Sequence, residues 1–176
     1  MPRNVEIKAR LADPGATRRL AAEAADGPPQ VLEQTDTFFR VPAGRLKLRE
    51  LRAGPAELIF YRRPDTHEPS ESHFERVAVP DAAALRGVLA SALGVAGTVA
   101  KRRLLYRVGR TRVHLDEVEG LGHFLELEVE MAPGEPGEAG AREAGHLMRR
   151  LGIPESALVA EAYVDLIRSQ SEKVRR

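Results

Sequence analysis

The chain has 176 residues, of which 43% are hydrophobic, which is enough for one well-packed domain and short for two. It carries 27 basic and 26 acidic residues, so no overall field favours nucleic acid or an anionic membrane. It contains no cysteine, no apolar run long enough to span a bilayer and no leader-like start. We expect a cytoplasmic monomer or homodimer that binds neither nucleic acid nor membrane, with one domain over residues 1–170 and a frayed tail over 171–176.

The first half of the chain is predicted to contain five strands, because apolar and polar side chains alternate along it. These strands cover residues 4–11, 31–41, 45–51, 57–63 and 72–79. Asp13 and Asp81 are each placed to cap a helix, and we expect helices over residues 13–25 and 81–93.

The second half continues with a strand over residues 99–108 and then a hairpin over residues 112–130, RVHLDEVEGLGHFLELEVE. One face of this hairpin is apolar and the other is charged. A Pro/Gly/Glu-rich loop is expected over residues 132–140, followed by helices over 141–151 and 160–169.

Several strands share this division between an apolar and a charged face. For one hairpin alone, a charged face turned to water would explain the pattern. Four amphipathic helices, however, need apolar partners, so we predict an α+β fold with helices packed outside a closed or nearly closed antiparallel eight-stranded β barrel or tunnel. The side chains expected to point inward are Glu6, Lys8, Lys47, Arg49, Arg62, Glu75, Lys101, Arg103, Asp116, Glu126 and Glu128.

Such an interior suits polyphosphate chemistry. Clustered lysine and arginine side chains hold phosphate oxygens through charge-assisted hydrogen bonds. Glu126 and Glu128 lie two apart on one strand face and, with Glu6 and Asp116, offer oxygen ligands of the kind that Mg²⁺ or Mn²⁺ prefers. A lone E-x-E pair is usually a solvated strand face, so the interpretation depends on the cation-bearing strands being in a compatible register.

Six segments, in order along the chain, carry a resemblance to a known family: VEIK at residues 5–8, LKLR at 46–49, YRRP at 61–64, VAKRR at 99–103, HLD at 114–116 and FLELE at 124–128. They are similar to the CYTH superfamily, also called triphosphate tunnel metalloenzymes. This superfamily includes class IV adenylyl cyclases, thiamine triphosphatases and inorganic triphosphatases. The stretch DEVEGLGHFLELE most resembles the class IV adenylyl cyclase branch.

The resemblance implies roles for individual residues. The implied catalytic residues are Glu6, Lys8, Lys101, Arg103 and Asp116. Phosphate binding is implied for Lys8, Lys47, Arg49, Arg62, Lys101 and Arg103. Binding of Mg²⁺ or Mn²⁺ is implied for Glu6, Asp116, Glu126 and Glu128. The family's first strand reads E-x-E-x-K, whereas this chain has Asn4 at the first of these positions. The resemblance therefore does not decide whether a second metal site is present.

The implied reaction is the conversion of ATP to cyclic AMP and pyrophosphate. The alternative is hydrolysis of an inorganic or organic triphosphate, such as tripolyphosphate or thiamine triphosphate, and a third hypothesis is a polyphosphate or nucleotide binding module with weak activity. Other residues are interpreted more simply: Asp36, Phe38 and Phe39 as fold and packing residues, Tyr163 as a core anchor, and His73 and His114 as hydrogen-bonding or rim residues.

Overall fold

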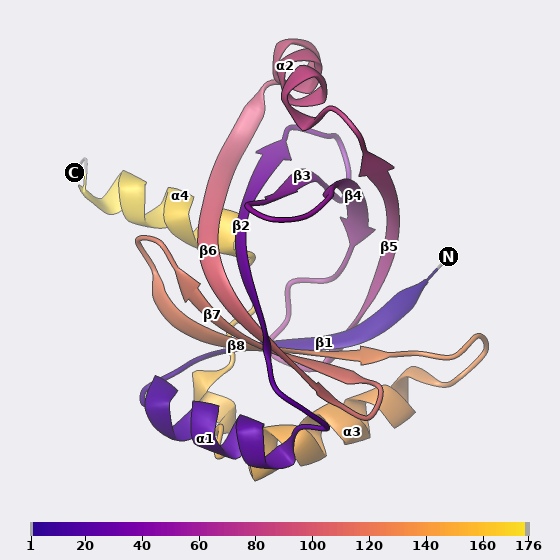
Figure 1. Cartoon of the computed structure of the whole chain (residues 1–176), viewed down its shortest axis with the longest axis vertical. Coiled ribbons are helices and arrows are strands. Elements are labelled where there is room, and N and C mark those ends of the chain that lie inside the picture. The colour runs from indigo at the N-terminus through magenta and orange to yellow at the C-terminus, as the bar shows by residue number, and fades with distance from the viewer. Residues whose placement is uncertain (1, 175–176) are drawn as a thin grey trace.

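The computed structural model describes residues 2–174 and contains eight strands and four α-helices. The strands are β1 (Arg3–Arg10), β2 (Gln30–Phe39), β3 (Arg45–Leu51), β4 (Ala56–Arg62), β5 (Ser70–Val79), β6 (Val95–Val108), β7 (Thr111–Val118) and β8 (Gly122–Glu130). The helices are α1 (Pro14–Ala24), α2 (Ala82–Leu93), α3 (Gly137–Arg150) and α4 (Tyr163–Val174), with a 3₁₀ turn at Glu155–Ala157. Every strand pairs with its neighbours antiparallel in the order β1-β5-β4-β3-β2-β6-β7-β8, and the ring closes between β8 and β1 (Figure 1). The predicted α+β barrel is confirmed.

The expected hairpin forms from β7 and β8, and it fixes which charges lie opposite one another. Arg112 pairs with Glu128 and His114 with Glu126 in the register of the two strands. The connecting turn contains Gly120, whose φ of 77° lies in the left-handed region that side chains other than glycine rarely adopt. Because side chains alternate across a strand, this register places all four paired residues on one face.

The apolar faces of β1, β7 and β8 turn outward and are covered by α1 and α3 (Figure 1). Val5, Leu125 and Leu127 from the sheet are fully buried against residues such as Leu147 of α3. Removing these apolar surfaces from water stabilises the fold by about 25 cal/mol per Å². The charged faces are thereby left to the interior of the barrel.

β6 and α3 each begin four residues earlier than expected. β6 starts at Val95, because that residue pairs with Phe39 of β2. α3 starts at Gly137, inside the expected loop over 132–140, where Pro136 takes the N-cap position and Glu138 lies in the first turn. An acidic side chain at a helix N-terminus interacts favourably with the helix dipole, which favours this earlier start.

The last helix differs from the expectation at both ends. α4 begins at Tyr163 rather than at residue 160, because the preceding segment runs extended and Val159 N–H donates to the Lys8 carbonyl at 2.8 Å. α4 then continues through residues 171–174, where a frayed tail was expected, with Asp165 in its first turn and Lys173 in its last. Residues 175 and 176 of the expected tail lie outside the described residues.

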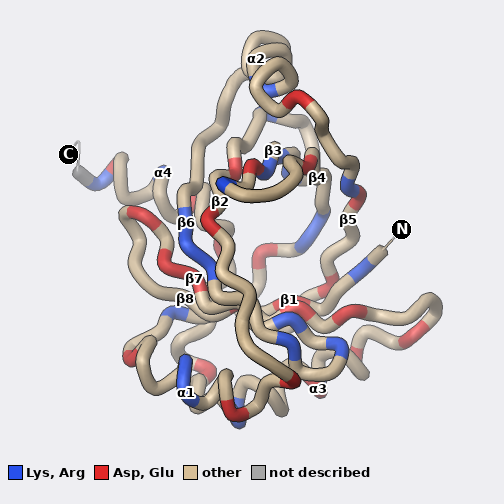
Figure 2. Tube along the Cα trace, viewed as in Figure 1, with Lys and Arg blue, Asp and Glu red and all other residues tan. Residues whose placement is uncertain are grey.

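Charged residues of both signs follow the barrel strands, as Figure 2 shows along the Cα trace. Within residues 2–174, none of the helices has the length and apolar character required to cross a membrane.

Candidate active site

The barrel encloses a cavity whose wall combines basic, acidic and aromatic side chains. Eight of the predicted inward residues line it: Glu6, Lys8, Lys47, Arg49, Lys101, Arg103, Glu126 and Glu128. They come from β1, β3, β6 and β8, so the strand register brings together side chains that are far apart in the sequence. The inward orientation of these eight residues is as predicted, whereas their chemical roles stay predictions.

Arg62 and Glu75 are corrections to the predicted set, because the structure places both on the outside of the barrel. On β4 the inward positions are Ile59 and Tyr61, so Arg62 points outward, where its guanidinium lies 5.3 Å from the centre of the Phe60 ring. Glu75 is directly opposite Phe60 in the β4–β5 register and is exposed.

Arg63, the next residue in the chain, lines the cavity instead of Arg62. Its Nη1 lies 3.4 Å from Glu6 Oε2, and its Nη2 donates to the Ala160 carbonyl at 3.2 Å. The sequence offered no means of choosing between the two adjacent arginines by charge. The one available indication was the position of the neighbours, since Ile59, Tyr61 and Arg63 are two residues apart and therefore fall on the same face of the strand.

Asp36 holds two of the predicted phosphate-binding cations in place. Lys47 Nζ donates to Asp36 Oδ2 at 2.9 Å, and Arg49 donates to both carboxylate oxygens at 2.9 Å. Burial alone would raise the pKa of Asp36, but Lys47 and Arg49 outweigh burial and hold it well below its ordinary value. Burial is also the main reason that the pKa of Lys47 falls to about 8. Asp36 was interpreted as a packing residue, and its position shows that it orders the basic wall.

Asp116 holds a second group of cations in place, as Asp36 does the first. Arg103 donates to both of its oxygens at 2.6 Å, Lys101 Nζ donates at 3.0 Å and the Tyr163 hydroxyl donates at 3.1 Å. Three of these hydrogen bonds go to Oδ2 and one to Oδ1, so Asp116 orders the cations around it. Metal binding by Asp116 stays a prediction.

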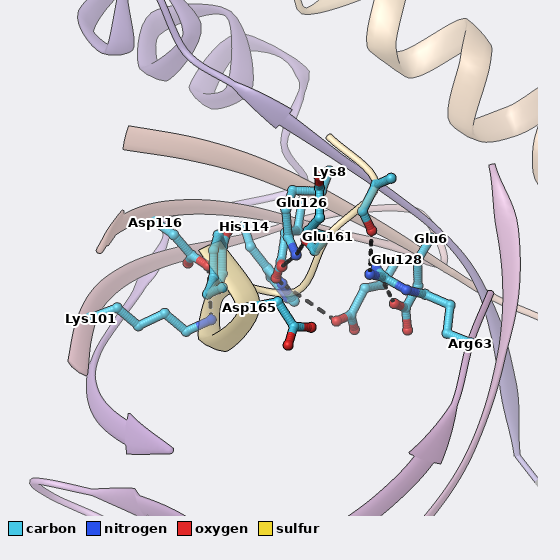
Figure 3. A network of polar contacts seen from close by, with 12 residues as sticks. Glu6, Lys8, Arg63, Lys101, His114, Asp116, Glu126, Glu128, Glu161 and Asp165 are labelled. Carbon is cyan, nitrogen blue, oxygen red and sulfur yellow. Dashed lines mark hydrogen bonds and ion pairs between the residues drawn. The ribbon is translucent and has the colours of Figure 1, made fainter. Parts of the chain in front are cut away.

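Glu126 and Glu128 form the acidic wall (Figure 3). Each retains one oxygen without a short hydrogen bond. Arg103 donates to Glu126 Oε2 at 2.6 Å, and Lys8 Nζ lies 3.5 Å from Glu126 Oε1. Arg112 donates to Glu128 Oε2 at 2.5 Å. Burial would raise the pKa of Glu126, yet the nearby lysines and Arg103 hold it well below its usual value, so this carboxylate is ionised.

The pKa of Glu6 is raised, whereas that of Glu126 is lowered. Glu6 is opposite Glu128 in the β1–β8 register, and its nearest cation is Arg63 at 3.4 Å. Burial, and then the charge of Glu128, raise the pKa of Glu6 to about 7. Among the cavity carboxylates, Glu6 is therefore the one that can gain or lose a proton near neutral pH.

A divalent cation fits the donor atoms on this acidic wall. Within the described residues, His114, Glu126 and Glu128 can each direct one ligand atom so that all three lie within 4.8 Å of one another. Burial and then Arg103 lower the pKa of His114, which keeps the imidazole neutral and able to bind a metal. Two carboxylates and an imidazole are suitable ligands for a divalent ion. Glu6 lies next to this group, because it pairs with Glu128 between β1 and β8.

Asn4 occupies the position where the resemblance leads one to expect a glutamate. It is 4% exposed, and its side-chain oxygen, when turned toward Arg112, accepts from Arg112 Nη2 at 3.2 Å. Arg112 was not predicted as a site residue, although it alternates with His114 and Asp116 along β7. The neutral amide at position 4 thus lies beside an arginine that also binds Glu128.

Aromatic side chains form the rest of the wall. Lys47 Nζ lies 5.5 Å from the ring centre of Phe38 and 5.4 Å from that of Tyr61. Tyr163 packs edge to face on Phe124 with ring centres 5.0 Å apart, and Lys8 Nζ lies 4.2 Å from the centre of the Tyr163 ring. Tyr163 is a core anchor, as interpreted, and it also braces the cations of the cavity.

The profile of the CYTH domain family matches residues 2–163 of the chain. The chain belongs to the CYTH family. CYTH proteins are the triphosphate tunnel metalloenzymes, so this CYTH domain is an enzyme of that class, and the resemblance seen in the sequence is confirmed. In a sequence comparison, no curated protein matches this CYTH domain.

Solved structures share the fold. A protein from Pyrococcus horikoshii superposes with a TM-score of 0.83 at 24% identity, over 93% of this chain and 98% of its own. A candidate adenylate cyclase from Vibrio parahaemolyticus gives 0.75 at 21% identity, over 94% and 97% of the two chains. A candidate adenylyl cyclase from Hippeastrum, reported to have a dominant triphosphatase activity, gives 0.65 at 21% identity, over 95% and 96%. At these identities the likeness establishes the fold of this CYTH domain and leaves its reaction to be tested.

Proposed function

We propose that the chain is a divalent-metal-dependent enzyme that converts ATP to cyclic AMP and pyrophosphate, with Mg²⁺ or Mn²⁺ as cofactor. The observation that carries this proposal is the juxtaposition, in one cavity, of a basic wall, an acidic wall and an aromatic wall beside Lys47. The first suits a triphosphate, the second a metal ion and the third a flat nucleoside base.

The basic wall would hold the phosphates. In the structure Asp36 and Asp116 keep the cations oriented, and they leave Lys47, Arg49 and Lys101 lining the cavity. Lys8 and Arg63 donate to backbone carbonyls of Glu161 and Ala160, acceptors that phosphate oxygens would replace. Because charge-assisted hydrogen bonds to phosphate are stronger than bonds to neutral carbonyls, this exchange favours the anionic ligand.

In the proposed reaction, the ribose 3′-oxygen forms a bond to the α-phosphorus, the bond from that phosphorus to the bridging oxygen breaks, and pyrophosphate leaves. The proton of the 3′-hydroxyl passes to a base, and Glu6 is placed to accept it because it lines the cavity beside Glu128. The basic wall would stabilise the charge that develops on the departing pyrophosphate. A divalent ion at Glu126 and Glu128 would neutralise phosphate oxygens as a Lewis acid.

A second candidate is hydrolysis of a triphosphate such as tripolyphosphate or thiamine triphosphate. The observation that favours it is the position of Glu6 again, because a carboxylate lining the cavity can equally take a proton from water. The two reactions use the same residues and differ in which phosphorus is attacked.

The test is a product assay with purified protein, ATP or tripolyphosphate, and Mg²⁺ or Mn²⁺, read by phosphorus NMR and nucleotide chromatography. Cyclic AMP with equimolar pyrophosphate would support the cyclase, and orthophosphate would support the hydrolase. Glu128→Gln, a nearly isosteric change, should abolish either product while circular dichroism remains that of the folded protein. Binding of both substrates without any product would favour a binding module.

A further inference from the structure

His114 is a buried imidazole that makes no hydrogen bond. It is 2% exposed, and among the described residues neither Nδ1 nor Nε2 has a partner. A buried polar group without a partner costs about 1–3 kcal/mol, so it calls for an explanation, and a bound ion is one that supplies the missing partner. The expectation that His114 lies at the rim is wrong, because its side chain is buried.

The imidazole faces the acidic wall. His114 is directly opposite Glu126 in the β7–β8 register, and its Nδ1 lies 3.7 Å from Glu126 Oε2 and 3.7 Å from Glu128 Oε1 (Figure 3). These separations are too long for hydrogen bonds. With metal–ligand distances of about 2.1 Å, two ligands of an octahedral ion are roughly 3.0 Å apart when adjacent and roughly 4.2 Å when opposite. The observed separations exceed the adjacent-ligand distance by about 0.7 Å, a gap that a small movement of the side chains on metal binding would close.

The oxygens facing His114 are partly engaged by arginines. Arg103 donates to Glu126 Oε2 at 2.6 Å, and Arg112 donates to Glu128 Oε2 at 2.5 Å. These bonds fix both carboxylates and leave Glu128 Oε1 directed toward the imidazole. The nitrogen is therefore held on the same side of a small polar space as the free oxygen of Glu128.

We propose that His114 is a third ligand of the divalent ion, beside Glu126 and Glu128, and that its nitrogen makes the site select a transition ion such as Mn²⁺ over Mg²⁺. This proposal rests on the metal dependence in the proposed function. Mg²⁺ binds almost entirely through oxygen, whereas imidazole is a good ligand for transition ions. An all-carboxylate site would provide no such preference.

The test uses the full chain and the metals alone. Pulsed electron paramagnetic resonance of bound Mn²⁺ should show ¹⁴N modulation that becomes ¹⁵N modulation when the protein is labelled with ¹⁵N-histidine. In calorimetric titrations His114→Gln should weaken Mn²⁺ binding at least about tenfold while changing Mg²⁺ binding by less than about threefold. His73→Gln, a change at an exposed histidine outside the barrel, is the matched control and should leave both affinities unchanged.

Bound Mn²⁺ without histidine ¹⁴N modulation in the unaltered protein would overturn the proposal, and this result does not depend on any variant folding. Equal losses of Mn²⁺ and Mg²⁺ affinity in a folded His114→Gln protein would also overturn it. If the modulation is seen in a protein that forms no product, the result would support His114 as a metal ligand and count against the proposed function. Product formation without the modulation would exclude His114 as a metal ligand and leave the proposed function unaffected.

Discussion

Replacing Asp36 by asparagine tests whether the basic wall is ordered by a buried counter-charge. The substitution keeps the size of the side chain and removes its charge. Asp36 is 2% exposed and accepts three hydrogen bonds of 2.9 Å, one from Lys47 and two from Arg49. Removing one partner from a buried ion cluster typically costs about 3–5 kcal/mol, because the remaining charges lie uncompensated.

We therefore expect Asp36→Asn to lower the free energy of unfolding of the unliganded protein by about 3–5 kcal/mol. For a chain of this size each kcal/mol changes the melting temperature by about 2–4 °C, so the melting temperature should fall by roughly 6–20 °C. Urea and thermal unfolding followed by circular dichroism measure both quantities. Saturating tripolyphosphate with Mg²⁺ should reduce the difference, because the ligand supplies negative charge to the same cations.

The control is Glu33→Gln, which removes an exposed carboxylate paired with Arg52 at 2.7 Å. Exposed ion pairs contribute little to stability, so this change should leave unfolding nearly unaltered. If Asp36→Asn were as mild as Glu33→Gln, a buried counter-charge would not be ordering Lys47 and Arg49. If tripolyphosphate stabilised the two variants equally, these cations would not be part of its binding site.

Three further predictions concern single positions. Arg63→Ala should lower kcat/KM about 100-fold, roughly 2.7 kcal/mol of transition-state stabilisation, whereas Arg62→Ala should remain within about twofold of the unaltered enzyme; equal effects would contradict the orientation of β4. Asn4→Glu should draw Arg112 away from Glu128 and tighten Mn²⁺ binding about fivefold, roughly 1 kcal/mol, in a calorimetric titration, and an unchanged isotherm would count against that contact. Because burial lowers the pKa of both Lys8 and Lys47 from 10.5 to about 8, the unliganded fold should gain stability as the pH rises from 8 to 10.5, whereas tripolyphosphate affinity should fall over the same range; a constant affinity would show that neither lysine binds phosphate.

The barrel could be predicted because its strands repeat one physical pattern. In β3 and in the hairpin of β7 and β8 the inward side chains are charged and most outward ones are apolar, so alternation alone assigns the faces. Lys47, Arg49, Glu126 and Glu128 were placed correctly for this reason. The covering helices followed from the same argument, since the apolar face needs a partner.

The errors lie where that pattern is absent. β4 carries apolar residues on both faces, and its last residue, Arg62, is followed directly by Arg63, so charge could not distinguish the two. The ion-pair partners could not be read from the sequence either. Whether a carboxylate orders neighbouring cations depends on which donors reach it in the fold, as Lys101, Arg103 and Tyr163 do at Asp116.

The seam between β1 and β8 has a consequence for folding. Glu6 and Glu128 are direct partners across it, although the chain between them contains almost the whole barrel. Contacts of such long sequence separation form slowly, because the intervening chain must first lose its conformational freedom. A nascent chain that has not yet synthesised β8 therefore has no acidic wall, and Glu6 comes to lie beside that wall only after the last strand has joined the first.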